Sequence, residues 1–134
     1  MAGLTGEVKG VIEKSKGWAF ATSDENGIPN VVPIAFGKVL SESQVMLIDV
    51  FMDKSLENIT ENPKVAVSVW DMETLKGYQL KGAARVETSG ELFDEAAKMV
   101  KSMMPQLKAK GVVIIDIDKI YVTSPGPDIG KELG

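Results

Sequence analysis

The chain has 134 residues, 44% hydrophobic and 25% charged, the composition of a globular protein with one domain. Its formal net charge of −4 argues against general binding to nucleic acid or to an anionic membrane. The chain has no cysteine and no histidine, which excludes disulfides, thiolate nucleophiles, imidazole bases and the usual zinc sites. An enzyme of this composition would depend on a bound cofactor for difficult chemistry.

The sequence shows no sign of membrane insertion or export. Its longest run without a charge, residues 26–37, contains two prolines and is shorter than the roughly 20 apolar residues that cross a bilayer. The N-terminus lacks a basic start followed by an apolar stretch. We therefore expect a cytoplasmic protein.

The first predicted element is a helix between residues 4 and 15. Val8, Val11 and Ile12 recur at helical spacing, and Thr5 is placed to cap the helix.

A hairpin is predicted next. The apolar runs 18–23 and 31–40 flank Asn26-Gly27, a pair typical of tight hairpins. Pro33 indicates that the return strand lies at an edge or carries a bulge. A third strand is predicted at 45–50, and a short helix at 55–61 ends at Asn62-Pro63.

The second half of the chain predicts a pair of long strands. Residues 64–70 alternate strictly between two faces, and residues 78–87 form their partner strand. Gly82 within the partner marks a bulge or the close approach of another group.

An amphipathic helix and a final strand complete the pattern. The helix runs from about residue 90 to 104, and Pro105 ends it. The strand covers 112–124, with a bulge near 116–119, and the tail 125–134 has no core pattern.

These elements predict one domain over residues 1–134 with a mainly β fold. Strands joined by short turns form an antiparallel sheet, which curls into a barrel to remove its edges. We therefore expect a β-barrel of six or more antiparallel strands with accessory helices.

Lys54 and Ser55 begin the short helix, and two interpretations compete. Ser55 could simply cap the helix, with Lys54 in solvent. Alternatively, free N–H groups, the Ser55 hydroxyl and the Lys54 ammonium could bind a phosphate. A lysine at a helix start is unfavourable for the helix dipole unless an anion is bound.

Other candidate sites are weaker. Residues 126–131 are too short for a P-loop and open no helix. Asp116 and Asp118 have no further ligand nearby and are better read as solvated strand residues than as a metal pair. Trp18 and Trp70 are better read as core or interface residues than as cofactor contacts. We therefore predict no metal site and assign no catalytic residue.

Several motifs occur in a fixed order along the chain: A-T-x-x-x-x-G-x-P at 21–29, Lys-x-x-x-Asn-x-x-x-Asn-Pro at 54–63, and Lys81-Gly82-x-Ala84. Their order and spacing resemble the FMN-binding split β-barrel proteins of the pyridoxamine 5′-phosphate oxidase-like group, above all its small FMN-binding proteins. The resemblance covers roughly residues 8–122.

The resemblance implies an antiparallel split barrel of the FMN-binding type and a homodimer with FMN at the subunit interface. The matching positions are Val32, Pro33 and Ile34 beside the flavin, Asp49, Val50, Phe51 and Met52 along the ring and ribityl chain, Lys54 and Ser55 at the phosphate, and Gln79 with Lys81 near the ring. On this resemblance the phosphate interpretation of Lys54 and Ser55 is favoured.

The sequence also departs from the family. The pyridoxamine-phosphate oxidases of this group hold their substrate with a C-terminal arginine and a histidine. Here the last arginine is Arg85 and there is no histidine, so that oxidase activity is not expected. The bulk of Val50 and Phe51 could narrow the ring pocket, and the tail 125–134 could fold over the partner's flavin.

The resulting hypothesis is an FMN-dependent oxidoreductase or electron-transfer protein with a small-molecule or protein redox partner. Three alternatives stay open. They are the same fold with deazaflavin F420 or haem, a non-enzymatic FMN carrier or sensor, and a cofactor-free structural dimer.

Overall fold

In the computed structural model, residues 3–133 are described, and they form three helices and eight strands. The helices are α1 (Gly6–Lys14), α2 (Lys54–Glu61) and α3 (Glu91–Met103). The strands are β1 (Trp18–Ser23), β2 (Pro29–Ile34), β3 (Gly37–Val39), β4 (Gln44–Asp49), β5 (Lys64–Trp70), β6 (Gly77–Glu87), β7 (Gly111–Val122) and β8 (Glu132–Leu133).

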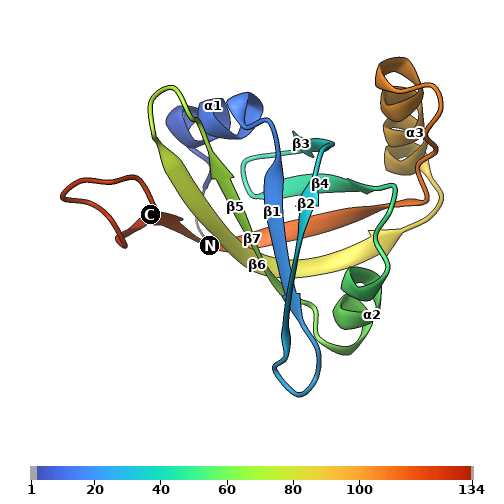
Figure 1. Cartoon of the computed structure of the whole chain (residues 1–134), viewed down its shortest axis with the longest axis horizontal. Helices are drawn as coiled ribbons and strands as arrows, with labels where there is room; N and C mark the ends of the chain where they lie inside the picture. Colours follow the sequence, from blue (N-terminus) through green and yellow to red (C-terminus); the bar gives the residue numbers. More distant parts are fainter. Residues whose placement is uncertain (1–2, 134) are drawn as a thin grey trace.

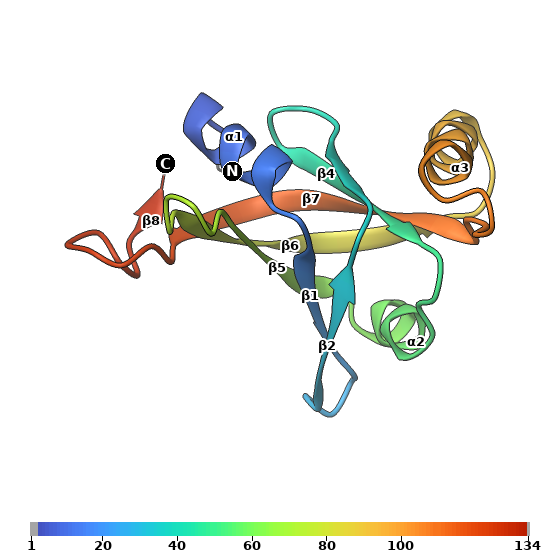
Figure 2. The ribbon, with the colours of Figure 1, turned by 45° about the horizontal axis from the view of Figure 1, so that its top comes forward.

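The strands form one antiparallel sheet in the order β2-β1-β5-β6-β7-β4-β3, with β8 paired to β7. The sheet curls into a half-barrel, with α1 across one end and α2 and α3 together on the opposite side of the molecule (Figures 1 and 2). The predicted fold class, a mainly β antiparallel split barrel with accessory helices, is confirmed.

Two apolar cores explain the pattern of the central strands. Alternate residues of β4 face opposite cores, with Val45 and Leu47 in the larger cluster and Met46 and Ile48 in the smaller one. The larger cluster includes residues of α1, β1 and β5, whereas the smaller cluster is closed by α3. β4 is therefore buried on both faces, which accounts for its unbroken apolar sequence.

The predicted return strand 31–40 is wrong in one respect, because it is divided into β2 and β3. Ile34, the last residue of β2, packs in the larger core, whereas Phe36 packs in the smaller core beneath α3. The chain crosses between the cores at this point, which places β2 and β3 at opposite ends of the sheet order. The edge position that Pro33 predicted is confirmed.

The predicted bulges occur together where β6 meets β7. The register pairs Lys81 with Lys119 and Gly82 with Ile117, so Asp118 is the extra residue of β7. A Cβ atom at position 82 would collide with the backbone of β7. Gly82 is therefore required by the close approach of the two strands.

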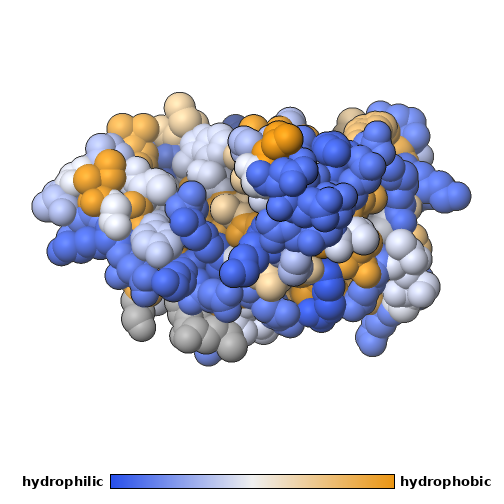
Figure 3. Space-filling view, turned by 90° about the horizontal axis from the view of Figure 1, so that it is seen from below, coloured by the Kyte–Doolittle hydropathy of each residue, from blue (hydrophilic) through white to orange (hydrophobic). Residues whose placement is uncertain are grey.

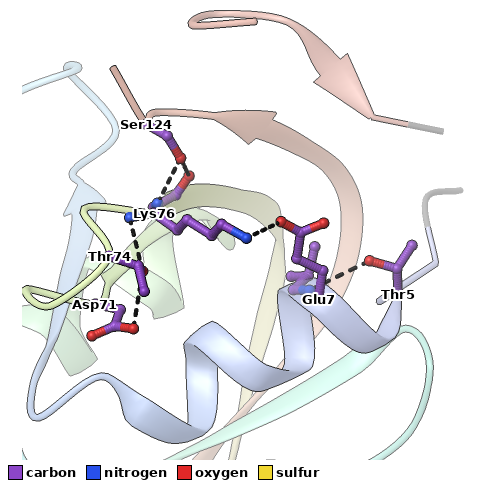
Figure 4. A network of polar contacts seen from close by, with 8 residues as sticks. Thr5, Glu7, Asp71, Thr74, Lys76 and Ser124 are labelled. Atoms are coloured by element: carbon purple, nitrogen blue, oxygen red, sulfur yellow. Dashed lines mark hydrogen bonds and ion pairs between the residues drawn. The ribbon is translucent and has the colours of Figure 1, made fainter. Parts of the chain in front are cut away.

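Polar contacts fasten α1 and the C-terminal segment to the β5–β6 turn (Figure 4). The Lys76 Nζ atom lies 2.8 Å from a Glu7 carboxylate oxygen of α1. The Ser124 hydroxyl accepts a hydrogen bond of 2.8 Å from the Gly77 N–H. Thr5 accepts from the Val8 N–H at 3.4 Å, as predicted for the cap of α1.

The tail carries more structure than its sequence predicted. β8 pairs with β7 of the same chain, and Leu133 packs against the larger core. The face shown in Figure 3 is mostly hydrophilic, and apolar residues reach the surface in separate patches. Within residues 3–133 no helix combines the length and apolarity needed to cross a membrane.

Candidate functional site

A cleft of about 590 Å³ lies where the end of β2, the β4–α2 connection and the segment after α3 meet. The β4–α2 connection runs between α3 and α2 in both ribbon views (Figures 1 and 2). Most of the predicted site residues line the cleft: Val32, Pro33, Ile34, Val50, Phe51, Met52, Lys54 and Ser55. Segments far apart in the sequence are thus brought together at one cleft.

The cleft is apolar along its walls and polar at one end. Its walls include Val32, Ile48 and Leu107, while its polar end is formed by Lys54 and Ser55 at the start of α2. An apolar cleft with a few convergent polar groups is typical of a small-molecule or cofactor site.

The start of α2 offers hydrogen-bond donors to the cleft. Asp53 is the N-cap residue, and its side chain makes no capping hydrogen bond within the described part of the chain. The Leu56 N–H bonds to the Asp53 carbonyl at 3.1 Å, whereas the N–H groups of Lys54 and Ser55 precede the first helical hydrogen bonds. Ser55 is therefore not the helix cap, so that part of the capping interpretation is wrong, whereas Lys54 is exposed to solvent as that interpretation expected.

Lys54 is exposed, and within residues 3–133 its ammonium group has one weak partner. Its Nζ atom lies 3.6 Å from a Glu57 carboxylate oxygen, and both side chains are more than half exposed. Exposed ion pairs at this helical spacing contribute little to stability. The ammonium group is consequently free to turn toward an anion at the start of the helix.

Ser55 belongs to a buried polar network that the sequence did not predict. Asn30 donates one hydrogen bond of 3.1 Å to the Ser55 hydroxyl and another of 3.4 Å to the Thr22 hydroxyl. Asn58 also donates to Thr22, at 2.9 Å. Thr22 and Asn58 are fixed positions of the motifs at 21–29 and 54–63, which was the available signal. These motif positions join the β1–β2 hairpin to α2.

A third amide–hydroxyl contact joins the same two elements at the other end of α2. Asn62, the C-cap residue, donates to the Ser23 hydroxyl at 2.9 Å. The hairpin therefore supports α2 along its length, and this support fixes the helix start relative to the cleft.

Asp49 does not line the cleft. It is 1% exposed, and its Oδ1 atom accepts a hydrogen bond of 2.7 Å from the Met52 N–H. Burial raises the pKa of this carboxyl group, which the hydrogen bond from Met52 and the charge of Lys110 partly offset. Asp49 thus holds the turn that carries the cleft residues 50–52.

The raised pKa of Asp49 predicts a pH-dependent stability. The folded protein binds this proton more tightly than the unfolded chain, so the resulting stabilisation is present below the ordinary pKa of 3.8 and is lost as pH rises through the higher folded value. An asparagine at this position would keep an acceptor for the Met52 N–H but would not titrate. We therefore compare the free energies of unfolding of the wild type and of Asp49→Asn. The wild-type value minus the Asp49→Asn value should fall as pH rises.

Urea denaturation of both proteins from about pH 4 to pH 7 measures this difference. Contributions of other carboxylates, such as Glu7 and Asp71 with their lowered pKa values, occur in both proteins and cancel. A difference that stays constant or rises with pH would contradict the assignment.

Gln79 and Lys81 lie on β6 and do not line the cleft of their own chain. The Lys81 Nζ atom is 5.1 Å from the ring centroid of Tyr121, a cation–π distance. A position near the flavin would require a second copy of the chain, so their assignment stays a prediction.

The remaining candidates, Asp116, Trp18 and Trp70, do not line the cleft. Asp116 accepts from the Gln44 side-chain amide at 2.7 Å and pairs with Arg85 at 3.2 Å. Trp18 is buried in the larger core, whereas Trp70 is 40% exposed. Across residues 3–133 no three His, Cys, Asp or Glu side chains are grouped as a metal site requires.

Several known proteins are similar to this chain. An uncharacterized protein of Methanocaldococcus jannaschii is 42% identical over 113 residues, which make up 83% of this chain and 75% of that protein. The crystal structure of HupZ from Group A Streptococcus is 27% identical, covers 94% of this chain and 98% of its own, and has a TM-score of 0.81.

More distant structures share the fold, and their names state different cofactors. An FMN-binding protein from Syntrophomonas wolfei has a TM-score of 0.77 at 19% identity, with 87% of this chain and 83% of that chain covered. An F420 reductase has a TM-score of 0.66 at 16% identity, covering 84% and 94%. HutZ, the heme storage protein of Vibrio cholerae, has a TM-score of 0.65 at 20% identity, covering 91% and 95%.

The family comparison covers almost the whole domain. The model described as pyridoxamine 5′-phosphate oxidase matches residues 4–124, which include every strand from β1 to β7 and the entire cleft. The chain therefore belongs to the pyridoxamine 5′-phosphate oxidase family.

Proposed function

We propose that this protein binds FMN in the cleft and acts as a redox flavoprotein. One observation carries the proposal: an apolar slot ends at a helix start where Lys54, the Ser55 hydroxyl and free N–H groups meet. FMN has the matching distribution of polarity, because its largely apolar ring system is joined through a polar chain to a doubly charged phosphate. Helix N-termini that offer N–H donors are common phosphate sites.

Different residues of the chain would bind different parts of FMN. Lys54, Ser55 and the α2 N–H groups would hold the phosphate, and the apolar walls would keep water from the ring. Bound flavin supplies the electron or hydride transfer. We assign no general acid or base to the chain. It contains no histidine or cysteine, and the buried Asp49 carboxylate accepts a hydrogen bond from the Met52 N–H.

The proposal includes a homodimer in which the flavin lies between subunits. Gln79 and Lys81 would then approach the ring from the second copy, since they do not reach the cleft of their own chain. Light scattering of the purified protein measures the mass, and cross-linking of a cysteine placed at position 81 to one placed at position 51 tests the arrangement. A monomer that binds FMN would overturn this part of the proposal.

The cofactor assignment is tested by what the purified protein carries and binds. We expect a yellow protein that releases FMN, and an apoprotein that binds one FMN per chain. Parallel titrations with F420 and haem cover the cofactors of similar folds; the lack of histidine and cysteine removes common haem ligands. A protein that is colourless and binds no FMN would end the proposal.

A redox role requires a further measurement. Anaerobic mixing of the FMN-loaded protein with NADH or NADPH, followed by absorbance, shows whether the flavin is reduced. Reduction followed by transfer to an acceptor supports an oxidoreductase. A flavin that a chemical reductant reduces but that neither NADH nor NADPH reduces would support the carrier or sensor instead.

Removing the Glu57 carboxylate is expected to tighten FMN binding. Glu57 competes with the phosphate for Lys54 and repels it, while its surface ion pair contributes little to the fold. We expect the Kd of Glu57→Gln to fall by about two- to fivefold at low salt. Glu61→Gln, on an exposed residue at the far end of α2, is the control. Equal effects of the two changes would indicate net charge alone.

A further inference from the structure

The hydrogen bond from Asn30 to Ser55 has a direction that matters for the cleft. The Asn30 amide nitrogen donates to the Ser55 oxygen at 3.1 Å, so this oxygen acts as the acceptor. A hydroxyl that accepts in this way keeps its own hydrogen for another acceptor. None of the hydrogen bonds formed within residues 3–133 uses the Ser55 hydrogen, and Ser55 lines the cleft.

The Asn30 amide belongs to a hydrogen-bond network that includes α2 itself. Thr22 accepts from the amide nitrogens of both Asn30 and Asn58. Asn58 is 1% exposed and Thr22 is 4% exposed, so both are fixed inside the protein. Asn58 follows Ser55 by three residues and lies on the same side of the helix. The contacts therefore link Asn58 of α2 to Thr22 and Asn30 of the hairpin, and Asn30 in turn to Ser55 of α2.

We propose that Asn30 is a positioning residue that sets the Ser55 hydroxyl as a donor into the cleft and thereby makes the site select phosphorylated flavin. The inference rests on the proposed function. A buried hydroxyl with a fixed donor direction favours an acceptor such as a phosphate oxygen, and it gives nothing to a flavin that lacks the phosphate. Asn30 would touch neither ring nor phosphate and would act through Ser55.

Changing Asn30 to aspartate reverses this direction. A carboxylate can only accept, so the Ser55 hydrogen would turn to position 30, and the new charge would repel the phosphate. We expect Asn30→Asp to raise the Kd for FMN by about tenfold or more. The Kd for riboflavin, which has no phosphate, should stay within about twofold of the wild-type value.

A double-mutant cycle separates action through Ser55 from a general loss of structure. In the wild type, Ser55→Ala should weaken FMN binding, whereas in the Asn30→Asp background it should add almost nothing. Asn62→Ala is the matched control, because it removes an amide–hydroxyl contact between α2 and the hairpin that does not involve Ser55. It should lower stability to urea but keep the ratio of FMN to riboflavin affinities.

The outcomes distinguish this inference from the proposed function. If the wild type binds no FMN, the proposed function fails first. If the wild type binds FMN but Asn30→Asp keeps the wild-type ratio of affinities, or if Ser55→Ala costs as much in that background as in the wild type, Asn30 does not position Ser55. A loss of selectivity in Asn62→Ala equal to that of Asn30→Asp would likewise overturn the inference.

Discussion

Replacing Lys54 with methionine is expected to weaken FMN binding by about 10- to 150-fold, because a charge-assisted hydrogen bond contributes about 1.5–3 kcal/mol. Methionine keeps most of the length and the apolar stem of lysine, so the walls of the cleft should be preserved. The change removes only the ammonium at the start of α2, where the phosphate is proposed to bind. Titration of the apoprotein with FMN at fixed salt, followed by flavin fluorescence, measures the loss.

Lys64→Met is the matched control for this measurement. Lys64 is an exposed lysine at the start of β5, shortly after α2, and it does not line the cleft. It changes the net charge equally, so equal losses in the two variants would assign the effect to long-range charge. If Lys54→Met binds FMN as the wild type does, the phosphate does not lie at the start of α2.

Replacing Gly82 with alanine is expected to lower the free energy of unfolding by about 3 kcal/mol. The added Cβ would collide with the Asp116 carbonyl oxygen, and that backbone is held by pairing of β7 with both β4 and β6. The strands would have to separate at the bulge, because no flexible side chain can move aside. Urea denaturation followed by circular dichroism measures the change.

Gly10→Ala, in contrast to Gly82→Ala, is expected to raise the free energy of unfolding. Gly10 lies inside α1, and a Cβ there meets no atom within 4 Å. Alanine in an open helical position should stabilise the fold by about 0.5–1 kcal/mol. Wild-type stability in Gly82→Ala would show that β6 and β7 do not approach each other as closely as the structure indicates.

The sequence predicted the fold well where local patterns and tertiary packing agree. Val65, Val67 and Val69 alternate along β5 and are all buried, and Gly82 predicted the bulge. The break between β2 and β3 was not predictable, because residues 31–36 are apolar almost throughout. Only the position of two separate cores decides where the chain turns. Leu133 was missed because a two-residue strand has no periodicity.

The site was predicted in part for a related reason. The cleft residues lie in short continuous segments, such as 32–34 and 50–55, that a motif can mark. The network behind Ser55 joins residues 25 and 36 positions apart in sequence. Such contacts depend on how the β1–β2 hairpin lies against α2, which no local pattern encodes. The motif positions Thr22 and Asn58 were visible, but their contact was not.

The two prolines of β2 have a consequence for behaviour at high concentration. β2 ends the sheet order, and Val31 on it is 66% exposed, so its free side resembles a template for cross-β growth. Pro29 and Pro33 lack N–H groups and cannot donate to an incoming strand. They would protect the protein from forming fibrils through the same strand that provides one wall of the cleft.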